Sequence, residues 1–276
     1  MIGVLAATIG IWVGTLAGPD SPTRETAQDS LVASGQVHGV ANAVFENNWR
    51  TREGLISVLE RMGAVAALAD IATRHSKLDA QRLAIRSLGL VGNPEAQVPL
   101  RFLLKSEHRD LVVEALGLVG DTSDIVRTRA LLQDERADVR RRAALALVKL
   151  AGEGAVGDLV LLLGDPHHSV RFAVFDPLQS YGHLGAQAAL VVYDGLPMVG
   201  KQLALRLFGQ LHYAPAYGIL ESALVNEPWP IQLAAVRAIG VGGEATWVPI
   251  LKNAENKVSS PIVGMAIQDA INDCNK

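Results

Sequence analysis

The sequence is poor in the residue types that hold small, cross-linked or metal-bearing domains together. It has one cysteine, Cys274, so it can form neither an intrachain disulfide nor a cysteine-based zinc cluster. Aromatic residues make up only 5% of the chain, which leaves few large side chains to anchor a partner. Basic residues are outnumbered, with 25 Lys and Arg against 28 Asp and Glu, and this balance argues against a nucleic-acid partner.

The sequence also lacks the motifs that position a catalytic group. It has no serine in a GxSxG turn, no HExxH helix, no P-loop and no glycine-rich dinucleotide loop after a strand. Carboxylate pairs such as Asp134 with Asp138 stand at expected helix starts, where capping of free N–H groups accounts for them. The pair His167 and His168 has no third ligand at the four-residue spacing of a helical metal site. We therefore expect a protein that is not an enzyme and has no catalytic, cofactor-binding or metal-binding residue.

The chain has instead three columns of residues that recur in one register, at intervals of 28 to 32 residues by subtraction. The first column holds a bulky apolar residue: Leu59, Leu88, Leu116, Leu147, Leu178, Phe208, Ile239 and Ile271. Four residues earlier, every member of the second column is apolar: Leu55, Ala84, Val112, Ala143, Val174, Ala204, Ala235 and Ile267. Four residues later stand Gly63, Gly92, Gly120, Ala151, Gly182, His212 and Gly243. Glycine is the usual helix-ending residue with positive φ, so each unit predicts a helix that ends at this third column.

Residues 134–165 show the unit most clearly. Short acidic side chains at Asp134 and Asp138 suit a helix start, and small and apolar residues follow at helical spacing. The segment from Ala151 to Gly154 breaks the helix, and a second apolar run ends before Asp165-Pro166. Residues 51–276 are thus predicted to form an all-α stack of about seven helical hairpins, whose columns are buried between neighbouring hairpins.

The motifs of these units resemble the HEAT-repeat family, most closely the short HEAT-like repeats of the phycobiliprotein lyases. The resemblance is carried by Asp138-Val139-Arg140 with Ala143-Ala144, by Ser169-Val170-Arg171, and by LGLVG at 88–92 and 116–120. It covers about four fifths of the chain and implies a right-handed α-α superhelix, a HEAT-like solenoid. The family includes scaffolds, lyase subunits and DNA glycosylases, so the resemblance implies a fold and leaves the function open.

The first 18 residues have no charged side chain. Their length is at the lower limit for a membrane span, and small residues on one helix face, at Ala6, Gly10, Gly14 and Gly18, would let membrane helices pack closely. Three interpretations remain open: a retained membrane anchor, a cleaved signal peptide, and a buried terminal helix or misassigned start. The first predicts a membrane-associated, single-pass protein, with a slight preference for the extracytoplasmic side.

Residues 19–50 differ in character from both neighbours. Gly18 to Pro22 reads as a linker, because glycine and proline cluster there. From Thr23 to Asn48 the apolar pattern is helical but does not follow the repeat register, as expected for an atypical end cap. The predicted domains are therefore 1–18, an apolar anchor or signal segment; 19–50, a linker and N-terminal helical cap; and 51–276, the HEAT-like solenoid.

Two sets of residues are candidates for partner binding. Residues 73–150 hold 14 basic against 10 acidic side chains, and the first helices there carry Arg82, Arg86, Arg141, Arg142 and Lys149. Interspersed acidic residues, among them Asp110 and Glu114, are expected to neutralise much of this strip. The C-terminal half is poor in charge, and Trp229 and Trp247 make it the other candidate surface.

These features favour an interaction protein. We expect a non-catalytic scaffold or accessory subunit of a membrane-associated complex, with protein partners, no nucleic acid and no cofactor, tethered by residues 1–18. The alternative, which rests on the resemblance alone, is a bilin lyase-like subunit that takes part in attaching or detaching a chromophore.

Overall fold

The computed structural model describes residues 2–16 and 22–275, with the backbone alone for residues 2–8 and 22. Every regular element in these ranges is a helix. The chain divides into two compact units, Met1–Leu150 and Ala151–Lys276. The predicted all-α architecture is confirmed.

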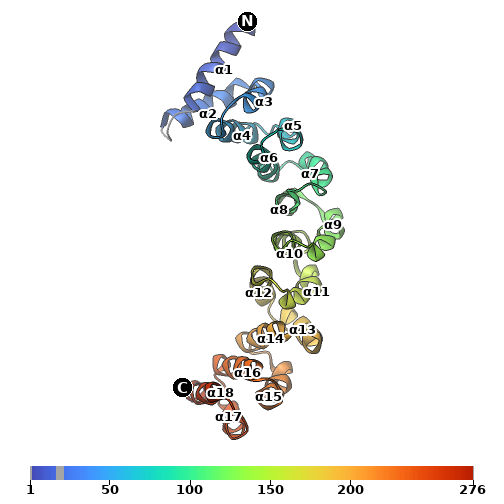
Figure 1. The fold of residues 1–276 in the computed structure, drawn as a ribbon, viewed down its shortest axis with the longest axis vertical. Helices are drawn as coiled ribbons and strands as arrows, with labels where there is room; N and C mark the ends of the chain where they lie inside the picture. Colours follow the sequence, from blue (N-terminus) through green and yellow to red (C-terminus); the bar gives the residue numbers. More distant parts are fainter. Residues whose placement is uncertain (1, 17–21, 276) are drawn as a thin grey trace. The chain divides into compact units, whose positions relative to one another are not determined.

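Unit 1 begins with three helices that precede the repeats: α1 (Ile2–Leu16), α2 (Pro22–Ser34) and α3 (Val37–Glu46). The first helices of its repeats are α4 (Trp49–Arg61), α6 (Leu78–Leu90), α8 (Arg109–Val119) and α10 (Ala137–Ala151). The second helices are α5 (Val65–Arg74), α7 (Gln97–Leu103) and α9 (Ile125–Ala130). Short 3₁₀ turns flank α7 and α9: η1 (Pro94–Ala96), η2 (Thr122–Asp124) and η3 (Leu131–Gln133). Within this unit the first helices form one layer and the second helices the other (Figure 1).

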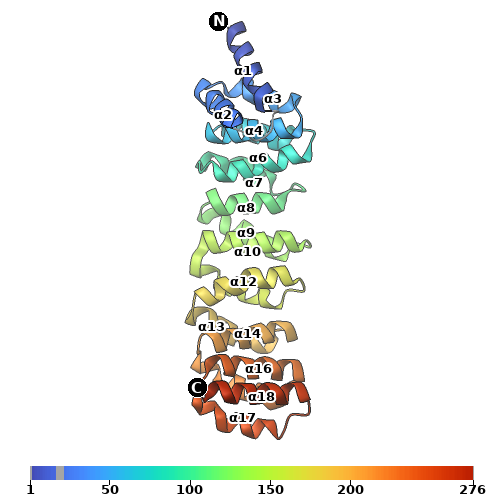
Figure 2. The same cartoon turned by 90° about the vertical axis from the view of Figure 1, so that its left-hand side faces the viewer.

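Unit 2 repeats the same two-layer plan (Figure 1). Its first helices are α12 (His168–Ser180), α14 (Met198–Gln210), α16 (Trp229–Gly242) and α18 (Pro261–Cys274). Its second helices are α11 (Val156–Leu159), α13 (His183–Val192), α15 (Tyr217–Asn226) and α17 (Val248–Glu255). The 3₁₀ turns are η4 (Gly152–Ala155), η5 (Val160–Gly164), η6 (Tyr193–Gly195), η7 (Ala214–Ala216) and η8 (Ala245–Trp247). Viewed toward the first layer, α14, α16 and α18 lie side by side (Figure 2).

The apolar columns form the core of both units. All eight bulky residues of the first column are buried, and the most exposed of them, Ile271, shows 7% of its surface. All eight members of the column four residues earlier are 0% exposed. The columns therefore stabilise each hairpin against the next by burying apolar surface, worth about 1.5–3 kcal/mol for a fully buried Leu, Ile or Phe side chain. The prediction that these residues pack between hairpins is confirmed.

The glycine column ends helices as predicted, with one exception. The backbone angle φ is positive, between 58° and 70°, at Gly63, Gly92, Gly182 and Gly243. Gly120 has φ −68° and extended backbone, so its need for glycine has another cause. A Cβ there would lie 2.4 Å from the Leu116 carbonyl oxygen, and that clash excludes a side chain.

The prediction that residues 1–18 form a membrane-spanning helix is corrected by the structure. No helix in the described ranges is long and apolar enough to cross a membrane, and α1 has 15 residues. Its last turns pack on the following helices, where Val13 and Leu16 are 9% and 0% exposed and Leu16 lies against Gly54 of α4. The single-pass anchor, and the localisation based on it, are therefore wrong, because packing against helices uses the same apolar residues that a span would.

Of the small residues predicted to pack membrane helices, Gly10 and Gly14 can be placed, and both face open space. A Cβ built at Gly10 or Gly14 would have no atom within 4 Å. The side chain of Ala6 and the whole of Gly18 lie outside the described residues. The packing of Val13 and Leu16 agrees with a buried terminal helix, whereas Ile11 is 67% exposed, and the signal-peptide interpretation stays a prediction.

Candidate partner-binding groove

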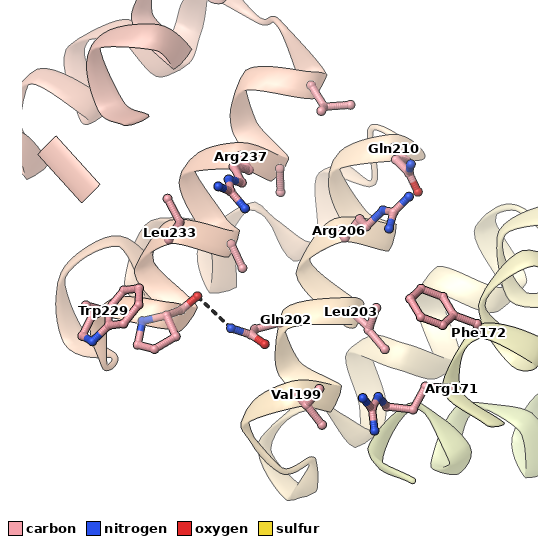
Figure 3. Close-up of a pocket in the computed structure, with 14 residues that line it drawn as sticks. Arg171, Phe172, Val199, Gln202, Leu203, Arg206, Gln210, Trp229, Leu233 and Arg237 are labelled. Atoms are coloured by element: carbon pink, nitrogen blue, oxygen red, sulfur yellow. Dashed lines mark hydrogen bonds between the residues drawn. The ribbon is translucent and has the colours of Figure 1, made fainter. Parts of the chain in front are cut away.

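The outer face of the first helices in unit 2 is hollowed between α12, α14 and α16. The hollow has a volume of about 650 Å³, and we call it the α12–α16 groove. Its residues come from consecutive turns of these helices, so they follow the register of the repeat. The lining includes Arg171 and Phe172 of α12, Leu203, Arg206 and Gln210 of α14, and Trp229, Leu233 and Arg237 of α16 (Figure 3). Val241 of α16 lines it as well.

Large apolar side chains in the groove are exposed to solvent. Phe172, Trp229 and Val241 are 59%, 51% and 62% exposed. Several large apolar side chains exposed around one hollow are typical of a contact site, whereas single exposed apolar residues are common. Residues with small side chains, Ala234 and Ala238, lie between the larger ones and leave room for an occupant.

Polar contacts fix the two helices that form the groove's main walls. The amide nitrogen of Gln202 donates a hydrogen bond to the carbonyl oxygen of Pro230 at 3.1 Å, joining α14 to α16 (Figure 3). At the same end, the Lys201 ammonium pairs with the Glu227 carboxylate at 3.0 Å. The groove is thus held by packed helices and not by mobile loops, which suits a preformed binding site.

Three arginines bring positive charge to the groove. The Arg171 guanidinium donates hydrogen bonds to the carbonyl oxygens of Asp165 and Pro166 at 2.7 and 3.0 Å. The Arg206 guanidinium lies 4.8 Å from the centre of the Phe175 ring. Within the described residues, neither Arg206 nor Arg237 has a carboxylate partner, and no lining residue of the groove is Asp or Glu. The groove is therefore apolar and positively charged.

An acceptor in the groove also lacks a partner. The side-chain oxygen of Gln210, on the last turn of α14, is buried and receives no hydrogen bond within the described residues. A buried polar atom without a partner costs about 1–3 kcal/mol, so a donor brought by an occupant would be favourable there.

The first-helix face continues from α16 to α18 with the opposite charge. A second hollow of about 570 Å³ shares Leu233, Arg237 and Val241 with the groove. Ile262 and Met265 of α18 are 50% and 63% exposed there, and Asp269 and Asp273 also line it. Along this face, positive charge on α14 and α16 thus gives way to negative charge on α18.

The two tryptophans predicted as contact residues have different surroundings. Trp229 lines the groove and is half exposed. Trp247 is 3% exposed and packs edge-on against Tyr217, with ring centres 5.1 Å apart, so it is a core residue that a partner cannot reach. Burial and a hydrogen bond to Glu244 raise the pKa of the Tyr217 hydroxyl to about 12.

The basic residues predicted in unit 1 do not form one continuous strip. Arg82 and Arg86 are exposed on α6 and line a hollow of about 440 Å³ beside Trp49. Arg142 of α10 pairs with Asp110 and Glu114 of α8, and its burial lowers the pKa of the guanidinium. The carboxylates of α8 therefore neutralise this side chain, as expected from their position in the sequence.

The remaining predicted basic residues are Arg141 and Lys149 of α10. Lys149 is exposed and Arg141 is partly exposed. They stay candidates for partner contacts, as do Arg82 and Arg86. The predicted absence of catalytic, cofactor-binding and metal-binding residues stays a prediction as well.

The register could have located two groove arginines that the sequence analysis missed. Arg206 and Arg237 stand two residues before the buried Phe208 and Ile239, and Arg86, which was selected, stands two residues before Leu88. All three arginines are exposed on a first helix. Phe172 gave no such signal, because an exposed aromatic residue on a helix cannot be told from a core one by spacing alone.

Each unit has the architecture of HEAT-like helical-repeat proteins. Among solved structures, the chain is similar to YibA of Escherichia coli, at 14% identity and a TM-score of 0.52, over 94% of this chain and 99% of that one. An identity this low shows a shared fold alone. No protein-family model and no curated protein match the sequence.

Two further solved structures are similar at lower TM-scores. One is the complex of CpcE and CpcF of phycocyanin lyase from Nostoc sp., at 17% identity and a TM-score of 0.41, over 96% of this chain and 94% of that one. The other is human deoxyhypusine hydroxylase in complex with glycerol, at 18% identity and a TM-score of 0.37, over 99% and 97%. Likenesses at these scores carry no argument about function.

Proposed function

We propose that this chain is a protein-interaction module, and that a segment of a partner protein binds in the α12–α16 groove. The observation that carries the proposal is the set of exposed apolar side chains, Phe172, Trp229 and Val241, that line one groove on the packed helices α12 and α16. Burying these side chains against a partner removes apolar surface from water, which contributes about 25 cal/mol of binding free energy per Å². Interface centres are enriched in aromatic residues and Arg, as this groove is.

The groove's chemistry supports binding over catalysis. Its lining is made of apolar residues, arginines and glutamines in the part of the chain described. Arginine stays protonated and glutamine does not titrate, so neither can serve as a general base or a nucleophile. The bilin lyase-like alternative stays an untested prediction, and no observation in the groove favours it.

Site-specific photo-cross-linking in the native host tests the proposal. A benzophenone amino acid replaces Phe172 in one variant and Leu161 of η5 in the other. Both native side chains are 59% exposed, and only Phe172 lines the groove. We expect a discrete protein adduct from position 172 that is absent from position 161. Adducts of equal yield and identity at the two positions, or none at 172, would contradict the proposal.

A further inference from the structure

Building on that proposed function, we propose that the partner segment is acidic and amphipathic, with carboxylates that pair with Arg206 and Arg237 and apolar side chains that fill the groove between α12 and α16. The segment belongs to a protein partner. Its recognition combines two features that the groove presents together, uncompensated guanidinium groups and exposed apolar side chains.

The charge of the groove requires a negative occupant. Covering Arg206 and Arg237 with a neutral segment would take two guanidinium groups out of water without a counter-charge, which is strongly unfavourable. Carboxylates on the segment remove that penalty, and arginine can bind a carboxylate through two parallel hydrogen bonds. No Asp or Glu lines the groove, and neither arginine forms an ion pair within the described residues, although Asp269 and Asp273 line the adjoining hollow that Arg237 shares.

The apolar lining excludes an occupant made only of charge. The sugar-phosphate backbone of a nucleic acid could pair with the arginines, but it offers no apolar side chains to cover the apolar part of the lining. Phe172, Leu203 and Leu233 offer contacts that apolar side chains of a peptide can use. A backbone or side-chain N–H from the same peptide can reach the unpaired oxygen of Gln210.

The charge change along the face also sets the direction of the segment. Its acidic residues belong over α14 and α16, where the unpaired arginines lie. The end that extends toward α18 meets Asp269, so a neutral or basic residue is favoured there. A segment with the reverse order would place like charges opposite each other at both ends.

A peptide-display selection against the full chain tests the inference. Random peptides are selected, and the affinities of the enriched ones are measured for the wild-type chain and for two charge-matched variants. Arg206→Gln/Arg237→Gln removes two cations from the groove, while Lys252→Gln/Lys257→Gln removes two exposed cations outside it. Thermal unfolding by circular dichroism shows that each variant is folded. If the double variant is destabilised because Arg206 no longer packs on the Phe175 ring, the single variant Arg237→Gln replaces it in the test.

We expect enriched peptides to combine Asp or Glu with apolar residues. Their binding should weaken about tenfold or more in the groove variant and less than about twofold in the control. Raising the salt concentration from about 0.05 to about 0.5 M should weaken it as well.

The outcomes separate this inference from the proposed function. Peptides without acidic enrichment that still lose affinity on Val241→Asp would overturn the acidic partner and keep the groove as a protein-binding site. Peptides unaffected by Val241→Asp, or an empty selection, would count against both. Binding of an RNA oligonucleotide or of anionic vesicles to the groove, in place of peptides, would also overturn the inference.

Discussion

At the scale of single residues, comparison of the repeats identifies one position where a residue other than glycine has a positive φ. His212 occupies the helix-ending position that glycine holds in most other units, and its φ is 48°. A side chain with a Cβ in this left-handed region costs about 1 kcal/mol relative to glycine. The ring is exposed, so the residue gains little packing in return.

We therefore predict that His212→Gly raises the free energy of unfolding by up to about 1 kcal/mol. Urea unfolding followed by circular dichroism measures it. The matched variant Gly243→Ala, at φ 63°, should lower stability by a similar amount. A His212→Gly variant that is less stable than the wild type would show that the imidazole makes a contact stronger than the backbone strain.

The pair Arg109 and Asp134 gives unit 1 a pH-dependent contribution to stability. The guanidinium donates two hydrogen bonds to the carboxylate, at 2.6 and 3.0 Å, and the carboxylate is 10% exposed. These bonds lower the pKa of Asp134 below its usual value. Because the folded-state pKa is the lower one, the pair stabilises the fold above the unfolded pKa of about 3.9 and loses its effect as the pH falls through the folded value.

We predict that Asp134→Asn destabilises the protein by about 1–2 kcal/mol at neutral pH. The difference from the wild type should shrink as the pH falls from about 5 to below about 3. Urea midpoints measured across this range test it, with Glu95→Gln, an exposed carboxylate of η1, as the control. A pH-independent difference would mean that the carboxylate's charge is not what stabilises the fold.

The spacing of residues predicted the buried apolar columns, but a third kind of column, made of polar residues, was not recognised from the sequence. Seven residues before the bulky core residue stand Arg52, Gln81, Arg109, Arg140, Arg171 and Lys201. Gln81, Arg140 and Arg171 hydrogen-bond carbonyls of the loop before their own helix. Arg52, Arg109 and Lys201 pair with a carboxylate near the start of the next repeat. The register was visible, but what these side chains reach depends on loop geometry that a periodic pattern does not contain.

At the scale of helices, close packing between first helices depends on a glycine facing an alanine. A Cβ on Gly117 would lie 2.8 Å from Ala146, and one on Gly209 would lie 2.7 Å from the Ala238 Cα atom. Each glycine directly follows the bulky core residue, and each alanine directly precedes the next one. The LGLVG motif at 116–120 therefore carries a packing requirement as well as a helix end.

We predict that Gly209→Ala destabilises the protein by about 1–3 kcal/mol, because α14 and α16 must move apart. The groove lies over the same contact, so peptide binding should weaken in parallel. Gly264→Ala in α18 is the control, since its added methyl group meets no atom within 4 Å and should leave stability equal or slightly higher. Equal melting temperatures for the two variants would contradict this account of helix contact.

Helix α1 shows where helix-scale prediction from sequence fails. An uncharged apolar segment can form either a membrane span or a helix packed on other helices, because both environments favour the same apolar side chains. In the structure Leu16 packs beside Gly54 of α4, where a Cβ built on the glycine would lie 3.4 Å from the Leu16 side chain. That contact joins residues 38 positions apart in sequence, which no local pattern indicates.

At the scale of the whole molecule, the repeat explains the fold but does not by itself select a partner. The columns bury one hairpin against the next, so function depends on the positions that the columns leave at the surface. Sequence reasoning identified Trp229 at the edge of the groove, and it also selected Trp247, which the core buries. Composition could not separate the two, because Trp229 is flanked by prolines, Trp247 stands two residues before Pro249, and both lie in a charge-poor region.

The most direct test of the account is the affinity of the partner captured at position 172 for two charge variants of the full chain. Val241→Asp places a carboxylate in the groove, and Val191→Asp places one on the exposed side of α13, where the native valine is 80% exposed. We predict a loss of about tenfold or more for Val241→Asp and a change of less than about twofold for Val191→Asp. Equal affinities for the two variants would contradict the assignment of the groove as the binding site.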